Sequence, residues 1–296
     1  MTSETGKSVT AKDAAETDAE VQVVKAPSPY LQAFKRPKGI VGFSLVGTLI
    51  LLALMSPWLF PGGYDEQGRD SLLTASLDHP FGTDQVGRDI FVRSIYALRT
   101  DLSLIFVAVP IAAVVGTLLG LTGVLSRRLG NATQRIFDVI LGFPGLVLGI
   151  TIAAILDPGW TSLVITITVL SIPGFGRIAR SQLLSEQEKE YVLAVRVLGV
   201  PKWRVLTRHI LPNVLEPAVV QLALAMVLGI FIEAALSLVG LGIQPPNPSI
   251  GTLLNASIRF MSVQPYYVLG PMITLLLLTL GLNLIADSLN ASLEER

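Results

Sequence analysis

Six long apolar stretches dominate the hydrophobic pattern of the chain, and polar segments separate them. A helix needs about 20 mostly apolar residues to cross the hydrocarbon core of a bilayer. The stretches are continuous rather than alternating, so they predict membrane-spanning helices and exclude the strands of a membrane barrel. The pattern therefore predicts an all-α, polytopic membrane protein with six transmembrane helices, at residues 39–60, 102–125, 136–156, 162–175, 214–238 and 267–285.

Prolines lie inside several of these spans. The fourth span is short and is broken by Pro173 and Gly174. Pro144 in the third span and Pro217 in the fifth are expected to kink their helices. Such kinks either soften helices around a translocation path or serve packing alone, and Pro144 is a candidate residue of such a path.

The polar segments divide the chain into regions. Residues 1–34 are rich in Thr, Ala, Glu, Asp and Lys and hold no apolar run, so they are predicted to be a disordered tail. A first transmembrane helix (35–60), an extracytoplasmic loop (61–101), a five-helix core (102–289) and a short C-terminus (290–296) follow. The core includes one large polar loop, residues 177–213.

Composition narrows the chemistry that the chain can perform. Hydrophobic residues make up 51% of it and charged residues only 15%, against roughly a quarter in a soluble domain. The net charge is zero, so nothing in it favours nucleic acid as a partner. The chain has no cysteine and two distant histidines, and Gly6-Lys7-Ser8 lacks the first glycine of a phosphate-binding loop. We therefore expect no catalytic residues, no metal site and no cofactor in this chain.

The distribution of basic residues predicts the orientation in the membrane. With the N-terminal segment in the cytoplasm, 17 of the 22 Lys and Arg residues fall inside and five fall outside. The positive-inside rule favours this arrangement over the inverted one. Both termini and the large loop are therefore predicted to be cytoplasmic.

The loop 177–213 predicts two short helices. Tyr191, Ala194, Val195 and Leu198 recur at the spacing of one helical face, and Gly199 suits the position that ends such a helix. Val200-Pro201 forces an extended step, after which a second helix carries Trp203, Leu206 and Ile210. Leu211-Pro212 is expected to repeat this step before the fifth span. A helix–turn–helix joined to two membrane helices can transmit the motion of a partner.

The same loop resembles the EAA signature of ABC-importer permeases, in the form of their dipeptide and oligopeptide branch. The matching residues are Glu190-Tyr191-Val192, Ala194-Val195-Arg196, Gly199 and Arg208–Asn213, which includes His209 and Pro212. Two other segments are similar to the same branch. They are His79–Asp89, with Gly82, Thr83, Asp84, Gly87, Arg88 and Asp89, and Glu233–Pro246, with Gln244 and Pro245.

The resemblance implies a type I importer permease fold with a cytoplasmic coupling helix, in the bacterial inner membrane. It implies a second permease subunit, two ATPase subunits that bind ATP and Mg²⁺, and an extracytoplasmic binding protein. It also implies that Glu190, Tyr191, Ala194, Arg196 and Gly199 contact the ATPase. The solute is expected to be a di- or oligopeptide, with nickel or another small solute as the alternative.

Further features have two readings from the sequence. Glu233 lies in the fifth apolar run, where a carboxylate is costly, so it either lines the translocation path or forms structural hydrogen bonds. Segment 84–99 either contacts the binding protein or is a structured outer loop, with Thr83 or Asp84 as a possible N-cap. Two rival functions remain, an ion-coupled transporter and a membrane scaffold. Because Glu233 stands largely alone, the sequence disfavours the first.

Overall fold

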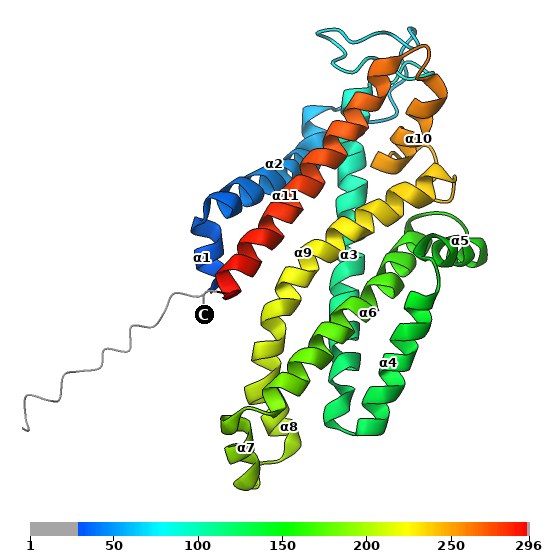
Figure 1. Ribbon diagram of the computed structural model, residues 1–296. Coiled ribbons are helices and arrows are strands. Elements are labelled where there is room, and N and C mark those ends of the chain that lie inside the picture. Colours follow the sequence, from blue (N-terminus) through cyan, green and yellow to red (C-terminus); the bar gives the residue numbers. More distant parts are fainter. Residues whose placement is uncertain (1–28, 295–296) are drawn as a thin grey trace, which may run out of the picture.

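The computed structural model of the protein describes residues 29–294, and all of its regular elements are helices. This confirms the predicted all-α membrane fold. Figure 1 shows a narrow, elongated bundle in which the long helices run roughly along one direction. The long helices are α2 (Pro37–Leu59), α3 (Ile90–Gly120), α6 (Trp160–Gln187), α9 (Leu211–Leu238) and α11 (Leu269–Glu294). The shorter elements are α1 (Pro29–Lys35), η1 (Leu121–Val124), α4 (Arg127–Gly142), α5 (Gly145–Leu156), α7 (Glu190–Val197), α8 (Lys202–Val205), the π-helix η2 (Leu206–Ile210), α10 (Ile250–Phe260) and η3 (Pro265–Val268).

The third predicted span is not one kinked helix. Five helices are individually long and apolar enough to cross a membrane, and α4 and α5 add a sixth crossing only as a pair bent by 90°. Phe143 has an extended backbone, and Pro144 caps α5. A residue before proline is pushed out of the helical region, which ends α4 at this point.

The break predicted in the fourth span is absent. Helix α6 runs for 28 residues and includes Pro173, so residues 177–187 extend a membrane helix and are not part of a loop. Pro173 is buried where α6 packs along α3. Packing against neighbouring helices allows a membrane helix to keep a proline at modest cost.

Small residues allow α3 and α6 to approach closely. A Cβ atom on Gly120 would lie 2.3 Å from the carbonyl oxygen of Gly176, and one on Gly116 would lie 2.5 Å from that of Ile172. On the other side, a Cβ on Gly176 would lie 2.2 Å from the ring of Phe137 in α4. Glycine is therefore required where these three helices meet.

Three boundaries differ from those predicted. Helix α3 begins at Ile90 rather than near residue 102, because the side chain of Asp89 caps it by accepting a hydrogen bond from the amide of Val92 at 3.0 Å. Helix α1 lies within the predicted tail, whose first 28 residues fall outside the described range. Helix α11 continues to Glu294, almost to the end of the chain.

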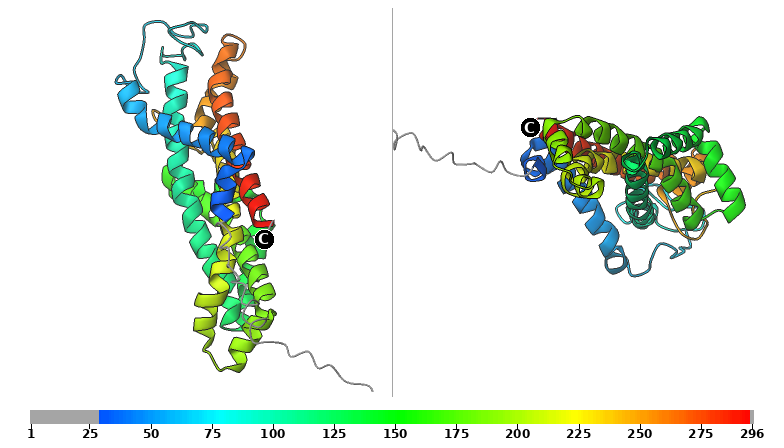
Figure 2. Two further views of the ribbon diagram at one scale, coloured as in Figure 1. Left: turned by 90° about the vertical axis from the view of Figure 1, so that its left-hand side faces the viewer. Right: turned by 90° about the horizontal axis from the view of Figure 1, so that it is seen from below.

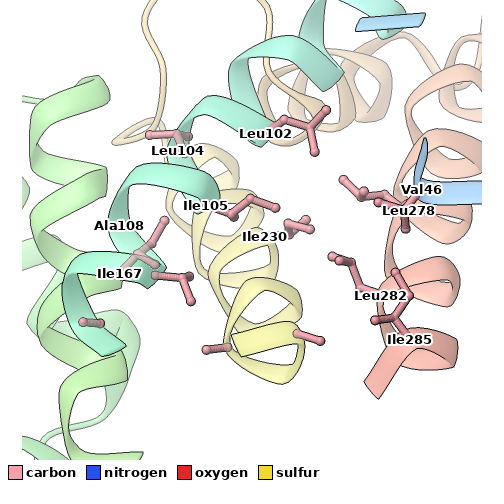
Figure 3. Close-up of a cluster of buried hydrophobic side chains, with 14 of the residues drawn as sticks. Val46, Leu102, Leu104, Ile105, Ala108, Ile167, Ile230, Leu278, Leu282 and Ile285 are labelled. Atoms are coloured by element: carbon pink, nitrogen blue, oxygen red, sulfur yellow. The ribbon is translucent and has the colours of Figure 1, made fainter. Parts of the chain in front are cut away.

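The core of the bundle joins five helices. In Figure 3, Ile230 of α9 lies between Ile105 of α3 on one side and Leu282 of α11 on the other, and Ala108 of α3 and Ile167 of α6 lie further out on the side of Ile105. Helix α2 contributes Val46 on the outer side of α11. Many large apolar side chains on the outer surface are exposed, as expected for helices that face lipid.

The two chain ends are tied together on one side of the bundle. The hydroxyl of Ser288 in α11 donates to the carbonyl of Ala33 in α1 at 2.8 Å, and Lys38 pairs with Asp287 at 3.1 Å. Figures 1 and 2 show α7 and α8 at the far lower end of the molecule, beyond the C-terminal end of α11. The loop 61–89, predicted to lie outside, and α10 lie at the opposite end.

Candidate functional site

Two short helices, α7 and α8, lie between α6 and α9, and we call residues 188–210 the coupling unit. Helix α7 ends at Val197, and Gly199 follows at the predicted C′ position with a φ of 75°, in the left-handed region that favours glycine. Pro201 precedes α8, also as predicted. The structure therefore places the EAA-like segment on a helix–turn–helix at one end of the bundle.

The passage from the coupling unit into α9 differs from the prediction. Residues Leu206–Ile210 form a π-helix, and α9 follows directly, so Leu211-Pro212 makes no extended step. The amide of Leu211 bonds to the carbonyl of Leu206. A wider turn relieves the clash that a proline ring makes with the carbonyl one turn earlier. Pro212 itself is exposed in the first turn of α9.

A small hydrophobic core fastens the coupling unit to three long helices. Val192 of α7, Val205 of α8 and Ile210 of η2 are at most 3% exposed. Full burial of such side chains contributes about 1.5–3 kcal/mol each. The coupling unit is therefore packed against η1, which follows α3 directly, and against α6 and α9, through contacts with Leu121, Ala179, Leu183 and Val214.

Glu186 fastens the same unit by polar contacts. Its buried carboxylate accepts hydrogen bonds from Lys189, from the hydroxyl of Tyr191 and, at 2.9 Å, from the side chain of Asn213. Burial and the bond to Glu186 raise the pKa of Tyr191 to about 12, so the hydroxyl remains a donor at physiological pH. Sequence reasoning missed Glu186, although its spacing of three residues from Lys189 was a usable signal.

The coupling unit carries exposed apolar side chains, which we call its exposed face. Leu198 is 79% exposed and Trp203 is 71% exposed, and Val197 and Tyr191 are also exposed. Glu190 is exposed at the start of α7. The side chains of Ala194, Val195, Arg196 and His209 lie outside the part that the structure describes. Exposed apolar side chains that gather beyond the membrane helices indicate a protein interaction surface.

At the opposite end, the segment His79–Asp89 is a tightly folded loop. Asp84 is fully buried and accepts from the guanidinium of Arg88 at 2.7 Å and from the amides of Val86 and Arg88. The hydroxyl of Thr83 bonds to the backbone of residues 70 and 73, and Asp89 also contacts His79 at 2.7 Å. The N-cap is therefore Asp89, not Thr83 or Asp84.

Of the remaining predicted loop residues, two glycines shape turns and two other residues line an open pocket. Gly82 and Gly87 both have a φ of 78°, which the turns of this loop require. The side chain of Gln244 donates to the carbonyl of Gly242 at 2.9 Å. Gln244 and Pro245 line a pocket of about 520 Å³ at the outer end, with Gln85, Asn255 and Arg259 as further lining residues.

Glu233 has a partner that the sequence did not reveal. Its carboxylate is 1% exposed, accepts from the hydroxyl of Ser237 at 2.6 Å and faces the first turn of α10. Asp101 of α3, predicted to end the outer loop, bonds to the same turn. The premise that Glu233 stands largely alone was therefore wrong. In the sequence, the only feature that marks Asp101 is its position as an acidic residue next to an apolar run.

Long apolar helices with a short-helix unit at one end and a folded loop at the other define an integral membrane protein. The chain belongs to the family of binding-protein-dependent transport system inner membrane components, which matches residues 102–296. It is 39% identical to the dipeptide transport system permease protein DppC of Alkalihalophilus pseudofirmus, over 92% of this chain and 91% of that protein.

Two further relatives cover most of the chain. The di/tripeptide transport system permease protein DppC of Pseudomonas aeruginosa is 36% identical over 91% of this chain and 93% of its own length. The glutathione transport system permease protein GsiD of Pectobacterium atrosepticum is 33% identical over 84% of this chain and 83% of its own length. The family membership agrees with the resemblance seen in the sequence.

Proposed function

We propose that this chain is the permease subunit of an ATP-driven importer for di- or oligopeptides. Relatives with dipeptide and di/tripeptide in their names match nine tenths of its length. In this proposal the chain lies in the bacterial inner membrane with both ends in the cytoplasm. It supplies half of the translocation path and pairs with a second permease. Two ATPase subunits hydrolyse ATP with Mg²⁺, and an extracytoplasmic binding protein delivers the peptide.

The observation that carries the proposal is the construction of the coupling unit. Leu198 and Trp203 are exposed, whereas Val192, Val205 and Ile210 are buried against η1, which follows α3 directly, and against α6 and α9. A partner that changes shape on binding ATP would move all three helices together. Each partner can shift the equilibrium between outward and inward states only by preferring one of them.

In this proposal the translocation path runs along the side of the chain where α4 and α5 are bent. Pro144 lies at this bend, and the groove beside it is lined by apolar side chains from α4, α5, α6 and α9. In the proposal this region faces the second permease subunit. Glu233 is assigned a structural role, because both of its oxygens accept hydrogen bonds inside the chain.

Co-purification tests the coupling surface. We would express the chain with its ATPase subunits and compare Leu198→Asp with Leu77→Asp, since Leu77 is fully exposed in the outer loop. The first change should abolish co-purification of the ATPase subunits, and the second should leave it intact. Equal retention by both variants would contradict the assignment of this surface.

Uptake into proteoliposomes tests the substrate class. The assembled transporter should accumulate a labelled dipeptide when its binding protein is present. ATP is supplied on the side of the vesicle membrane where the ATPase subunits lie. Unlabelled dipeptides should compete, and glutathione should be included because one relative is named for it. ATP-dependent uptake of nickel with no uptake of peptide would overturn the peptide assignment while leaving the permease assignment in place.

A further inference from the structure

Two carboxylates from different helices meet at the first turn of α10. The Oδ2 atom of Asp101 accepts a hydrogen bond from the amide of Ile250 at 3.0 Å. The Oε2 atom of Glu233 accepts from the next amide, that of Gly251, at 3.3 Å. Because these two amides are consecutive along the chain, the carboxylates that bind them are neighbours. Together they fasten α10 to α3 and to α9.

The two carboxylates are unequally supplied with hydrogen bonds. Both are 1% exposed. Glu233 receives a second donor, the hydroxyl of Ser237, on its other oxygen. The Oδ1 atom of Asp101 is buried and has no hydrogen-bond partner within residues 29–294. An ionised Asp101 would therefore leave a buried charged oxygen without a hydrogen-bond donor, which costs several kcal/mol by the usual scales.

None of the nearby described arginines forms an ion pair with these two carboxylates. Within the described range, neither carboxylate forms an ion pair. Arg93 of α3 is engaged with Asp84 and with the carbonyl of Tyr64, and Arg99 and Arg259 are exposed. The charged and titratable groups on the elements that pack around α10 are Arg93, Tyr96 and Arg99 on α3, Glu216 on α9, Arg259 on α10, Tyr266 and Tyr267 in η3, and Asp287 and Glu294 on α11.

We propose that Asp101 and Glu233 form a buried site for one proton, with the proton on Asp101 and the negative charge on Glu233. The N-terminus of α10 offers roughly half of a positive charge, enough to favour one anion but not two. Two like charges on neighbouring carboxylates in a buried site oppose each other strongly. Glu233 holds the charge because both of its oxygens have donors, and Asp101 holds the proton because only one of its oxygens does.

The site gives the outer pocket a sensitivity to pH. Helix α10 supplies the pocket residues Thr252, Asn255 and Arg259, and the two carboxylates fix its first turn. Loss of the shared proton would add a second negative charge and loosen α10. Because the proton is held in the folded protein, the stability that it contributes is present at low pH and is lost as pH rises.

Thermal unfolding of the assembled transporter tests the proposal. The wild type should show a midpoint that falls from mildly acidic to mildly alkaline pH. Asp101→Asn, which imitates the protonated acid, should remove this fall and keep the midpoint at least as high as in the wild type. Asp138→Asn is the control, because Asp138 is an exposed carboxylate paired with Arg177 and should leave the pH dependence unchanged.

Infrared spectroscopy provides a second readout that does not depend on the stability of a variant. The wild type at neutral pH should show the carbonyl stretch of a protonated carboxylic acid, which should be lost at high pH and absent from Asp101→Asn. The absence of this band from the wild type would overturn the proposal. A midpoint that depends on sodium rather than on pH would also overturn it, since it would make the ligand a metal cation.

Discussion

Replacing Glu186 by alanine should separate ATP hydrolysis from transport. The carboxylate joins the end of α6 to Tyr191 of α7 and Asn213 of α9. Without it, the coupling unit keeps its exposed docking face but loses its polar attachment to the membrane helices. We therefore expect the ATPase subunits to remain bound while uptake per ATP hydrolysed falls.

The size of the effect follows from the contacts. Hydrogen bonds to a charged group contribute about 1.5–3 kcal/mol each, so the bonds from Tyr191 and Asn213 together contribute roughly 3–6 kcal/mol. The pair with Lys189 adds at most about 1 kcal/mol, because the lysine side chain is half exposed. A loss of about 3 kcal/mol corresponds to an increase on the order of 100-fold in local opening.

Hydrogen exchange in the assembled complex measures this opening directly. The amides of α7 should exchange faster in Glu186→Ala by a factor on the order of 100, while those in the centre of α3 should be unchanged. Glu188→Ala is the matched control, since Glu188 is exposed next to the same helix. Unchanged exchange in α7, or an equal effect of both variants, would refute the attachment that we assign to Glu186.

Three further changes test other parts of the account. Gly199→Val should cost about 1–3 kcal/mol in thermal unfolding because of the positive φ, whereas Gly142→Val, at a helical position with open space, should cost less. Gly176→Ala should destabilise the protein by about 1–3 kcal/mol, since the new Cβ meets the ring of Phe137, and Phe137→Leu should restore part of the loss. Tyr191 has a raised pKa in the folded protein, so it contributes stability below pH 10 that is lost as pH rises through about 12. Tyr191→Phe should flatten a denaturation profile in that alkaline range.

Apolar periodicity and length were sufficient to predict the helical membrane fold. The coupling unit could be located from Gly199 and Pro201, because these residues act through local backbone rules that need no tertiary information. The fourth and third spans show the limit of such rules. Pro173 is buried within a continuous helix, whereas the helix before Pro144 ends, and sequence alone does not distinguish the two.

The polar contacts between distant segments could not be predicted. Glu186 and Asn213 are 27 positions apart, and Asp101 meets Ile250 across 149 positions. Single acids in or beside apolar runs indicate that a partner is needed, but only the packing of the helices shows which group it is. The pattern also did not show which side of α7 is buried. Val192, which is not on the predicted apolar stripe, is buried, whereas Tyr191 and Leu198 of the stripe are exposed.

In the proposed transporter, the exposed face of the coupling unit contacts an ATPase subunit. The chain contains no cysteine, so single cysteines can be introduced without background. A photoreactive cross-linker on Leu198→Cys should join this chain to the ATPase subunit in the assembled transporter, and the same label on Leu77→Cys should not. Failure of the label at position 198 to reach the ATPase, with and without nucleotide, would contradict the account.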